Sequence, residues 1–99
     1  MSSGVSRVMT GAILGTGVAI NVRTVGFRPR KVELINADSG DQMDWSSSMA
    51  DAAGYKRVAA GTGAMVSSGG VTPLSSGFTL GTDADMNAAG ETVHWIAYE

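Results

Sequence analysis

The sequence predicts an all-β protein, an antiparallel β-sandwich or jelly roll of about seven or eight short strands. Two observations predict this fold class. The chain has 14 glycines and only 2 prolines among 99 residues, which suits many tight turns, and short β-branched runs recur at spacings of about a dozen residues. Disorder is the competing interpretation of the many Gly and Ser residues, but 43% of the residues are hydrophobic and spread along the chain, which favours a folded core.

A chain of this length predicts a single domain, with residues 1–17 as an amino-terminal arm and first strand and residues 18–99 as the β-sandwich. The modest stability of so small a domain leaves room for oligomerisation. We expect no secretory signal, because the start lacks a basic stretch followed by a long apolar run, and no transmembrane segment, because the apolar runs are short. The lack of cysteine excludes a disulfide framework and fits synthesis in a reducing compartment.

The first half of the chain predicts four strands, bounded by turn residues: 6–14, 18–25, 30–37 and 42–47. In the second of them Val18, Ile20 and Val22 alternate onto one face. The third has apolar residues on both faces, with Ile35 opposite its other aliphatic residues. We therefore expect the third strand to be central in the sheet and covered on both sides.

The second half predicts a hairpin and two further strands. Residues 47–54 suit either one helical turn that ends at Gly54 or a loop. Residues 55–77 predict a hairpin with a loose tip, because glycines separate short apolar pairs. Short alternation predicts a strand in 77–81, and the last strand, 91–99, is apolar on both faces.

Alternate oxygen-bearing side chains at Asp83, Asp85 and Asn87 resemble the ligand spacing of a calcium loop. An EF-hand loop also needs glycine at its sixth position and glutamate at its twelfth, where this chain has Ala88 and His94. The same residues are typical of an Asx-turn, in which the side-chain oxygens accept hydrogen bonds from neighbouring backbone amides. We favour the turn and expect no metal and no cofactor.

Catalytic residues are scarce. A Ser–His–Asp relay would have to use His94, the only histidine, within a predicted strand, and no nucleophile-elbow motif is present. The four acids Asp38, Asp41, Asp44 and Asp51 cluster beside turn glycines, where structural roles are expected. No glycine-rich loop has the pattern that binds phosphates. We therefore expect the protein not to be an enzyme.

The charge of the chain points to protein partners. Its formal net charge is −2, and its only basic cluster in the sequence is Arg28, Arg30 and Lys31. A nucleic-acid site needs a broad cationic face with stacking aromatics, so we expect no nucleic-acid partner, and no membrane partner either. The cluster either contacts an acidic partner or is a solvated corner that protects a strand edge, and both alternatives remain open.

Two segments, VGFRPRKVELIN and GFTLGTDADMNAAGETVHWIAYE, carry a pattern of strand entries and turns. Its positions are Gly26, Phe27, Pro29, Val32, Gly77, Phe78, Leu80, Gly81, Asn87, Gly90 and the strand through Tyr98. The pattern is similar to one in structural proteins of tailed-bacteriophage virions, namely small head or tail proteins and the end domains of fibres. It covers roughly Val18 to Glu99, and residues 46–75 match nothing in that family.

The resemblance implies a non-enzymatic β-sandwich built into a virion. The resemblance does not give the location, but a single domain with no coiled coil or fibre shaft favours a capsid decoration protein. By analogy such a protein would lie on the outside of the head, often as a trimer, and bridge neighbouring capsid subunits. Its partners would be the major capsid protein or other virion proteins and copies of itself, with synthesis in the host cytoplasm and a final place on the capsid surface. The alternative is a receptor-binding or adhesion module of a tail or fibre.

Interface candidates lie in the amino-terminal arm, which could pair with the strand edge of a partner, and in the basic corner. They are Ser2, Ser3, Val5, Arg7, Arg28, Arg30 and Lys31. The alternatives for these residues are a frayed terminus and a solvated corner. Trp45 could anchor an interface or fill the core, and we favour the core.

Overall fold

The computed structural model describes residues 7–59 and 61–99, and these ranges form eight antiparallel strands. The strands are β1 (Val8–Leu14), β2 (Ile20–Val22), β3 (Lys31–Asn36), β4 (Gln42–Ser46), β5 (Ala53–Arg57), β6 (Gly63–Leu74), β7 (Gly77–Leu80) and β8 (Thr92–Tyr98). The described ranges contain no helix, and so none long and apolar enough to cross a bilayer. The predicted all-β antiparallel fold class is confirmed.

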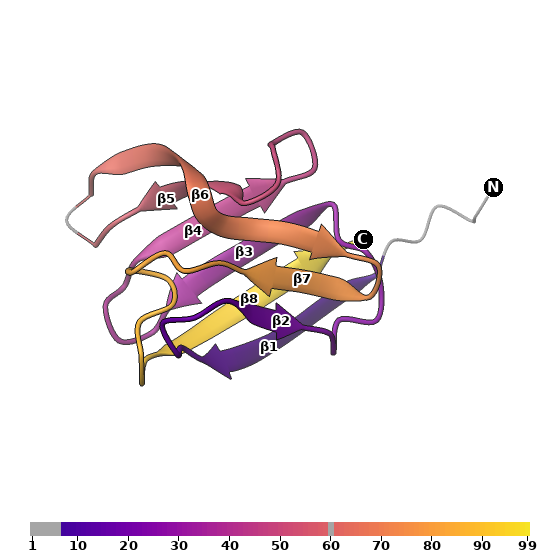
Figure 1. Cartoon of the computed structure of the whole chain (residues 1–99), viewed down its shortest axis with the longest axis horizontal. Helices are drawn as coiled ribbons and strands as arrows, with labels where there is room; N and C mark the ends of the chain where they lie inside the picture. Colours follow the sequence, from indigo (N-terminus) through magenta and orange to yellow (C-terminus); the bar gives the residue numbers. More distant parts are fainter. Residues whose placement is uncertain (1–6, 60) are drawn as a thin grey trace.

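All eight strands belong to one sheet, in the order β1-β8-β3-β4-β5-β6-β7-β2. The sheet curls so that β6, β7 and β2 lie over β4, β3, β8 and β1 (Figure 1). The finer expectation of a sandwich or jelly roll is not confirmed, because the strands are hydrogen-bonded into a single half-barrel. Its two edge strands are β1 and β2.

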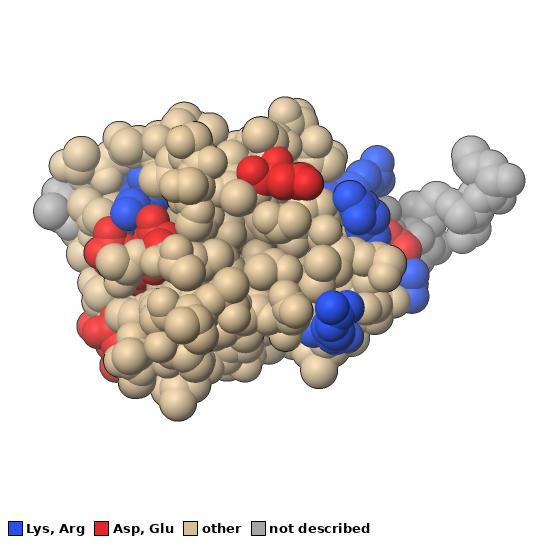
Figure 2. Space-filling model, viewed as in Figure 1, with Lys and Arg blue, Asp and Glu red and all other residues tan. Residues whose placement is uncertain are grey.

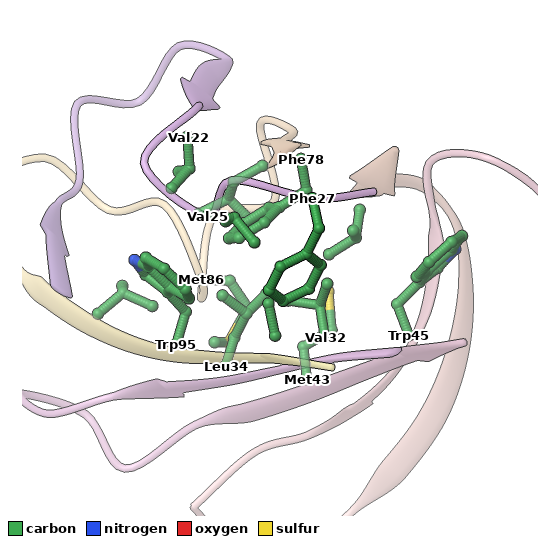
Figure 3. Close-up of a cluster of buried hydrophobic side chains, with 14 residues drawn as sticks. Val22, Val25, Phe27, Val32, Leu34, Met43, Trp45, Phe78, Met86 and Trp95 are labelled. Carbon is green, nitrogen blue, oxygen red and sulfur yellow. The ribbon is translucent and has the colours of Figure 1, made fainter. Parts of the chain in front are cut away.

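The hydrophobic core lies in the hollow of the curled sheet (Figure 3). Its buried members are Val22, Val25, Phe27, Val32, Leu34, Met43, Trp45, Val71, Phe78, Leu80, Met86, Val93, Trp95 and Ala97. Strand alternation explains the pattern, since every second residue of β3, β4, β7 and β8 points inward. The rings of Phe78 and Trp95 meet edge to face, with centroids 5.6 Å apart.

A bend in β6 lets the sheet fold over itself. Gly54 of β5 pairs with Val66, but the preceding residue Ala53 pairs with Val71, so residues 67–70 are left out of this ladder. Gly69 within the bend has φ of 78°, a left-handed conformation that favours glycine. The first part of β6 thus pairs with β5 and the second part with β7.

The helical turn considered for residues 47–54 does not form. The indole Nε1 of Trp45 donates to the carbonyl of Ala50 at 3.1 Å, and this bond fixes the segment as a turn. The positive φ of 66° falls at Ala52, while Gly54, the expected helix stop, lies within β5. Packing of Trp45 in the core therefore overrides the local helix signals, and its role as a core residue is confirmed.

Other strand expectations are partly wrong. Strand β3 is central, between β8 and β4, but it is not covered on both sides, because Ile35 is 43% exposed. Val18 is 65% exposed and lies before β2, which begins only at Ile20. The hairpin expected in 55–77 is formed by β5 and β6, although β5 begins earlier, at Ala53.

Candidate interaction surfaces

One end of the molecule gathers most of its positive charge. The antiparallel register brings together the start of β1, the end of β2, the start of β3 and the end of β8. Five of the seven basic residues lie in these segments, all exposed: Arg7, Arg23, Arg28, Arg30 and Lys31. Figure 2 shows most of the visible Lys and Arg at this end, which we call the basic end, whereas most of the visible Asp and Glu lie at the opposite end beside a smaller basic group.

Arg7 is exposed at the surface and also makes contacts within the chain. Its guanidinium binds the carboxylate of Glu99 through two nitrogens, at 3.0 and 2.6 Å, and lies 5.1 Å from the ring centroid of Phe27. The hydrogen bond from Arg7 lowers the pKa of the Glu99 carboxyl below its usual value. The pair fixes the start of β1 beside the end of β8, and it neutralises part of the charge of Arg7.

The corner at residues 28–31 is held by backbone contacts and keeps its side chains outward. The N–H of Arg30 donates to the carbonyl of Tyr98, and the carbonyl of Arg30 accepts from Ser47, both at 2.8 Å. Lys31 lies 3.5 Å from a Glu33 oxygen and 5.5 Å from the centroid of the Tyr98 ring. Within residues 7–59 and 61–99, Arg28 and Arg30 have no ion-pair partner, so their charge is available to another molecule.

The predicted interface residues are thus partly brought together. Arg7, Arg28, Arg30 and Lys31 share the basic end, whereas Ser2, Ser3 and Val5 lie outside the described residues. Sequence reasoning missed Arg23, an isolated cation that follows β2 and joins the basic end only because β2 ends there. No local signal marks Arg23, since its position depends on the pairing of β2 with β7.

The opposite end carries acidic loops, with Asp38, Asp41, Asp83, Asp85 and Glu91. Much of this acidity is used internally. Lys56 of β5 binds Asp83 at 3.1 Å and Asp85 at 2.8 Å, and the hydrogen bond with Asp85 is the largest cause that raises the pKa of Lys56. Asp41 is buried and accepts the N–H of Ala59 at 2.8 Å. These carboxylates position loops.

The calcium-like spacing at residues 83–87 forms the Asx-turn that we favoured. One Asp83 oxygen accepts the N–H groups of Asp85 and Met86, at 3.0 and 3.2 Å. Asn87 is buried, and its side chain binds backbone groups of Thr16 and Val18 in the β1–β2 loop and the carbonyl of Gly81. Among the residues with described positions, no group of three His, Asp or Glu side chains is arranged to hold a metal ion.

A groove of about 180 Å³ lies on the outer face of β8, β3 and β4. Its walls are Glu33, Leu34, Ile35, Gln42, Asp44, His94 and Ile96. Glu33 and Asp44 lie directly opposite each other in the β3–β4 register. The two like charges repel each other, and a cation bound between them would reduce this repulsion. The phenol of Tyr98 donates to Glu33 at 2.8 Å, and this hydrogen bond is the main cause that raises the pKa of Tyr98.

The groove does not contain the geometry of a catalytic relay. His94 is exposed on β8, and no side chain in the described ranges forms a hydrogen bond with it. A serine nucleophile and an orienting carboxylate would both need such bonds. The arrangement is a small, acidic and partly apolar depression.

Comparisons with known proteins give no relative for this chain: no protein family, no curated protein and no solved structure matches it.

Proposed function

We propose that this chain is a non-enzymatic structural protein of a tailed-bacteriophage virion, a capsid decoration protein that binds the outside of the assembled head and bridges capsid subunits. The observation that carries the proposal is the basic end, where five exposed cations lie together while the acidic side chains at the other end are largely used to position loops. A surface of this kind suits an acidic protein face.

The two segments that resemble virion proteins also meet in space, which supports the proposal. The N–H of Gly26 donates to the carbonyl of Ser76 at 3.0 Å, so the strand entry at 26–32 lies beside the strand at 77–80. Phe27 and Phe78, one from each segment, are both in the core. The shared pattern therefore corresponds to one packed unit rather than to two unrelated turns.

A decoration protein acts by binding the assembled shell more tightly than its separate subunits, so occupancy stabilises the shell by mass action. At a free concentration of about 100 times the dissociation constant, this contributes about 2.7 kcal/mol per site. No bond is made or broken. The chemistry required is a stable fold with an adhesive surface, and the groove and basic end together offer both signs of charge to neighbouring subunits.

Sedimentation tests the proposal. Empty heads that lack the protein are mixed with purified protein and pelleted, and host cells are treated in the same way. We expect the protein to pellet with heads but not with host cells. We also expect it to raise the temperature at which the heads lose their integrity. Pelleting with cells alone would support the alternative of a tail or fibre receptor-binding module.

The matched variants R28Q/R30Q and S67E/S68E change the net charge equally, the first in the basic end and the second in the exposed bend of β6. We expect only R28Q/R30Q to lose binding to heads. Equal binding by both variants would contradict a role for the basic end, and loss of binding by both would show that total charge matters rather than its place.

A further inference from the structure

The edge strand β1 presents a row of backbone groups without partners in the described part of the chain. Glu99 donates its N–H to the carbonyl of Arg7, and Gly15 donates to the carbonyl of Glu91, so the odd-numbered residues of this strand face β8. In an antiparallel ladder the alternate residues face the other way. They are Val8, Thr10, Ala12 and Leu14, and their four N–H and four C=O groups form what we call the β1 edge.

The β1 edge lacks the features that usually protect a sheet border. Strand β1 has seven residues, with neither charge nor proline nor bulge, whereas the other edge strand, β2, has three residues. Val8, Met9 and Leu14 are 54%, 42% and 61% exposed, and they are three of the seven large hydrophobic side chains that are exposed in the described ranges. A long and apolar edge of this kind is a site for strand addition.

The sequence of β1 fits an antiparallel copy of itself. With a two-fold axis at Gly11, Val8 faces Leu14 of the second copy and Thr10 faces Ala12, so every outward N–H and C=O finds a partner. The apolar pair and the small pair oppose no like charges. This self-complementarity selects a second copy of the chain as the occupant.

At the middle of β1, Gly11 makes a close contact with Trp95. A Cβ on Gly11 would lie 2.5 Å from Cζ2 and 3.0 Å from Nε1 of Trp95, so the indole lies directly beneath the strand. Trp95 is only 3% exposed, and its Nε1–H has no acceptor among the described residues, in contrast to Trp45. Every buried side-chain N or O atom of the described residues has a hydrogen-bond partner, so this N–H reaches solvent beside Gly11.

We propose that two copies of this chain pair through their β1 edges, antiparallel about Gly11, and so join their two sheets into one. The contact is isologous and closes with two copies. It therefore gives a dimer in solution, whereas the resemblance to virion proteins implies a trimer. This pairing requires no virion component and stands apart from the proposed binding to heads.

Sedimentation equilibrium of the full chain over a concentration series tests the pairing. We expect a mass of twice the 10.1 kDa chain. The variant T10K/A12K places lysines opposite each other on both sides of the two-fold axis and should raise the dissociation constant by about tenfold at low salt. T10K/A12E places lysine opposite glutamate in the same register and should retain the dimer, and S67K/S68K is the control for added charge.

Amide hydrogen exchange reports the register directly. In the dimer the amides of Val8, Thr10, Ala12 and Leu14 should be protected along with those that bond β8. In T10K/A12K, protection should persist only at Met9, Gly11 and Ile13, which also shows that the fold is intact. A monomeric or trimeric mass, rapid exchange at the outward amides of the native chain, or equal weakening by T10K/A12K and T10K/A12E would overturn the proposal. The last result would indicate a different strand as the occupant.

Discussion

Two buried asparagines hold the loops at the acidic end together. Asn87 accepts the N–H groups of Thr16 and Gly17 and donates to the carbonyls of Val18 and Gly81, so all four of its hydrogen-bonding positions are used. Asn36, which is fully buried, also uses all four positions: it accepts the N–H groups of Asp38 and Ser39 and donates to the Asp85 carbonyl and the Glu91 carboxylate. Asn87 thereby joins the β1–β2 loop to the long β7–β8 connection.

Replacement of Asn87 by Asp should destabilise the fold by about 3 kcal/mol. The substitution keeps the shape but replaces two donors with a carboxylate oxygen that faces the carbonyls of Val18 and Gly81. Chemical denaturation measures the free energy of unfolding. The control is N21D, because Asn21 is exposed and acts as an acceptor for Thr79, a role that a carboxylate preserves. Equal losses in the two variants would contradict the role of Asn87.

The pKa of Tyr98 should depend on Glu33. The hydrogen bond from the phenol to the Glu33 carboxylate is the largest cause that raises this pKa above 10.0, followed by burial, and the charge of Asp44 contributes least. In a Y55F background, ultraviolet absorbance follows Tyr98 alone. We expect E33Q to lower the pKa of Tyr98 more than D44N does, and a larger effect of D44N would contradict this order.

The same shift predicts a loss of stability at alkaline pH. Because the pKa of Tyr98 is raised in the folded chain, its hydrogen bond stabilises the fold fully below the ordinary value of 10.0. That contribution is lost as the pH rises through the raised value, since the ionised phenolate can no longer donate. In E33Q this part of the alkaline loss should be smaller.

Among the elements, the bend in β6 decides how the sheet closes. Gly70 is buried, donates to the carbonyl of Ala52 and accepts from Gly81, so the bend connects β5 with the start of the β7–β8 loop. Gly69 supplies the left-handed backbone that turns the strand. One long strand can therefore take part in both layers of the half-barrel.

Substitution of Gly70 by Ala should cost about 2 kcal/mol or more. A Cβ at this position would lie 2.7 Å from the carbonyl carbon of Ala53, and a backbone neighbour cannot rotate away as a side chain can. The control is S68A, an exposed position in the same bend, which should change stability by less than about 0.5 kcal/mol. Chemical denaturation of the two variants measures the free energy of unfolding. A small loss of stability in G70A would show that the backbone of the bend can shift to accommodate the methyl group.

Alternation in the sequence predicted the strands that line the core but not the ends of all elements. The inward residues of β4 and β7 follow from their period of two. Val18 fits the same period, yet it lies in a loop because Asn87, distant in the sequence, binds its carbonyl. The helix signals at 47–54 failed for a similar reason, since the bond from Trp45 to Ala50 is formed only when the tryptophan is packed in the core.

At the scale of the whole molecule, the strand order determines which candidate surfaces form. The basic corner at 28–31 was visible in the sequence, but its proximity to Arg7 and Arg23 depends on the register that brings the start of β1, the end of β2 and the end of β8 to one end of the molecule. The sequence alone did not reveal the β1 edge either. A sequence can indicate that a strand is apolar and uncharged, but its place at the border of a sheet is set by long-range pairing.

The separation of charge should give the protein an affinity for anionic surfaces despite its net charge. The formal net charge is −2, but the basic end has five cations against Glu33, Asp51 and Glu99. The molecule is 43 Å long, and the screening length is about 10 Å at 0.1 M salt, so a charged surface interacts mainly with the end that faces it. We therefore expect retention on a cation exchanger at pH 7 and low salt.

Two variants with the same net charge show whether retention depends on the location of the charges or on the total charge. R28Q/R30Q removes two cations from the basic end, and S67D/S68D adds two acids in the exposed bend of β6. The first should pass through the exchanger, because the remaining cations include Arg7, which is paired with Glu99. The second should elute at nearly the salt concentration of the native chain, since its new charges lie outside the basic end. Equal loss of retention in both would mean that total charge governs the interaction, and the basic end would then have no separate role.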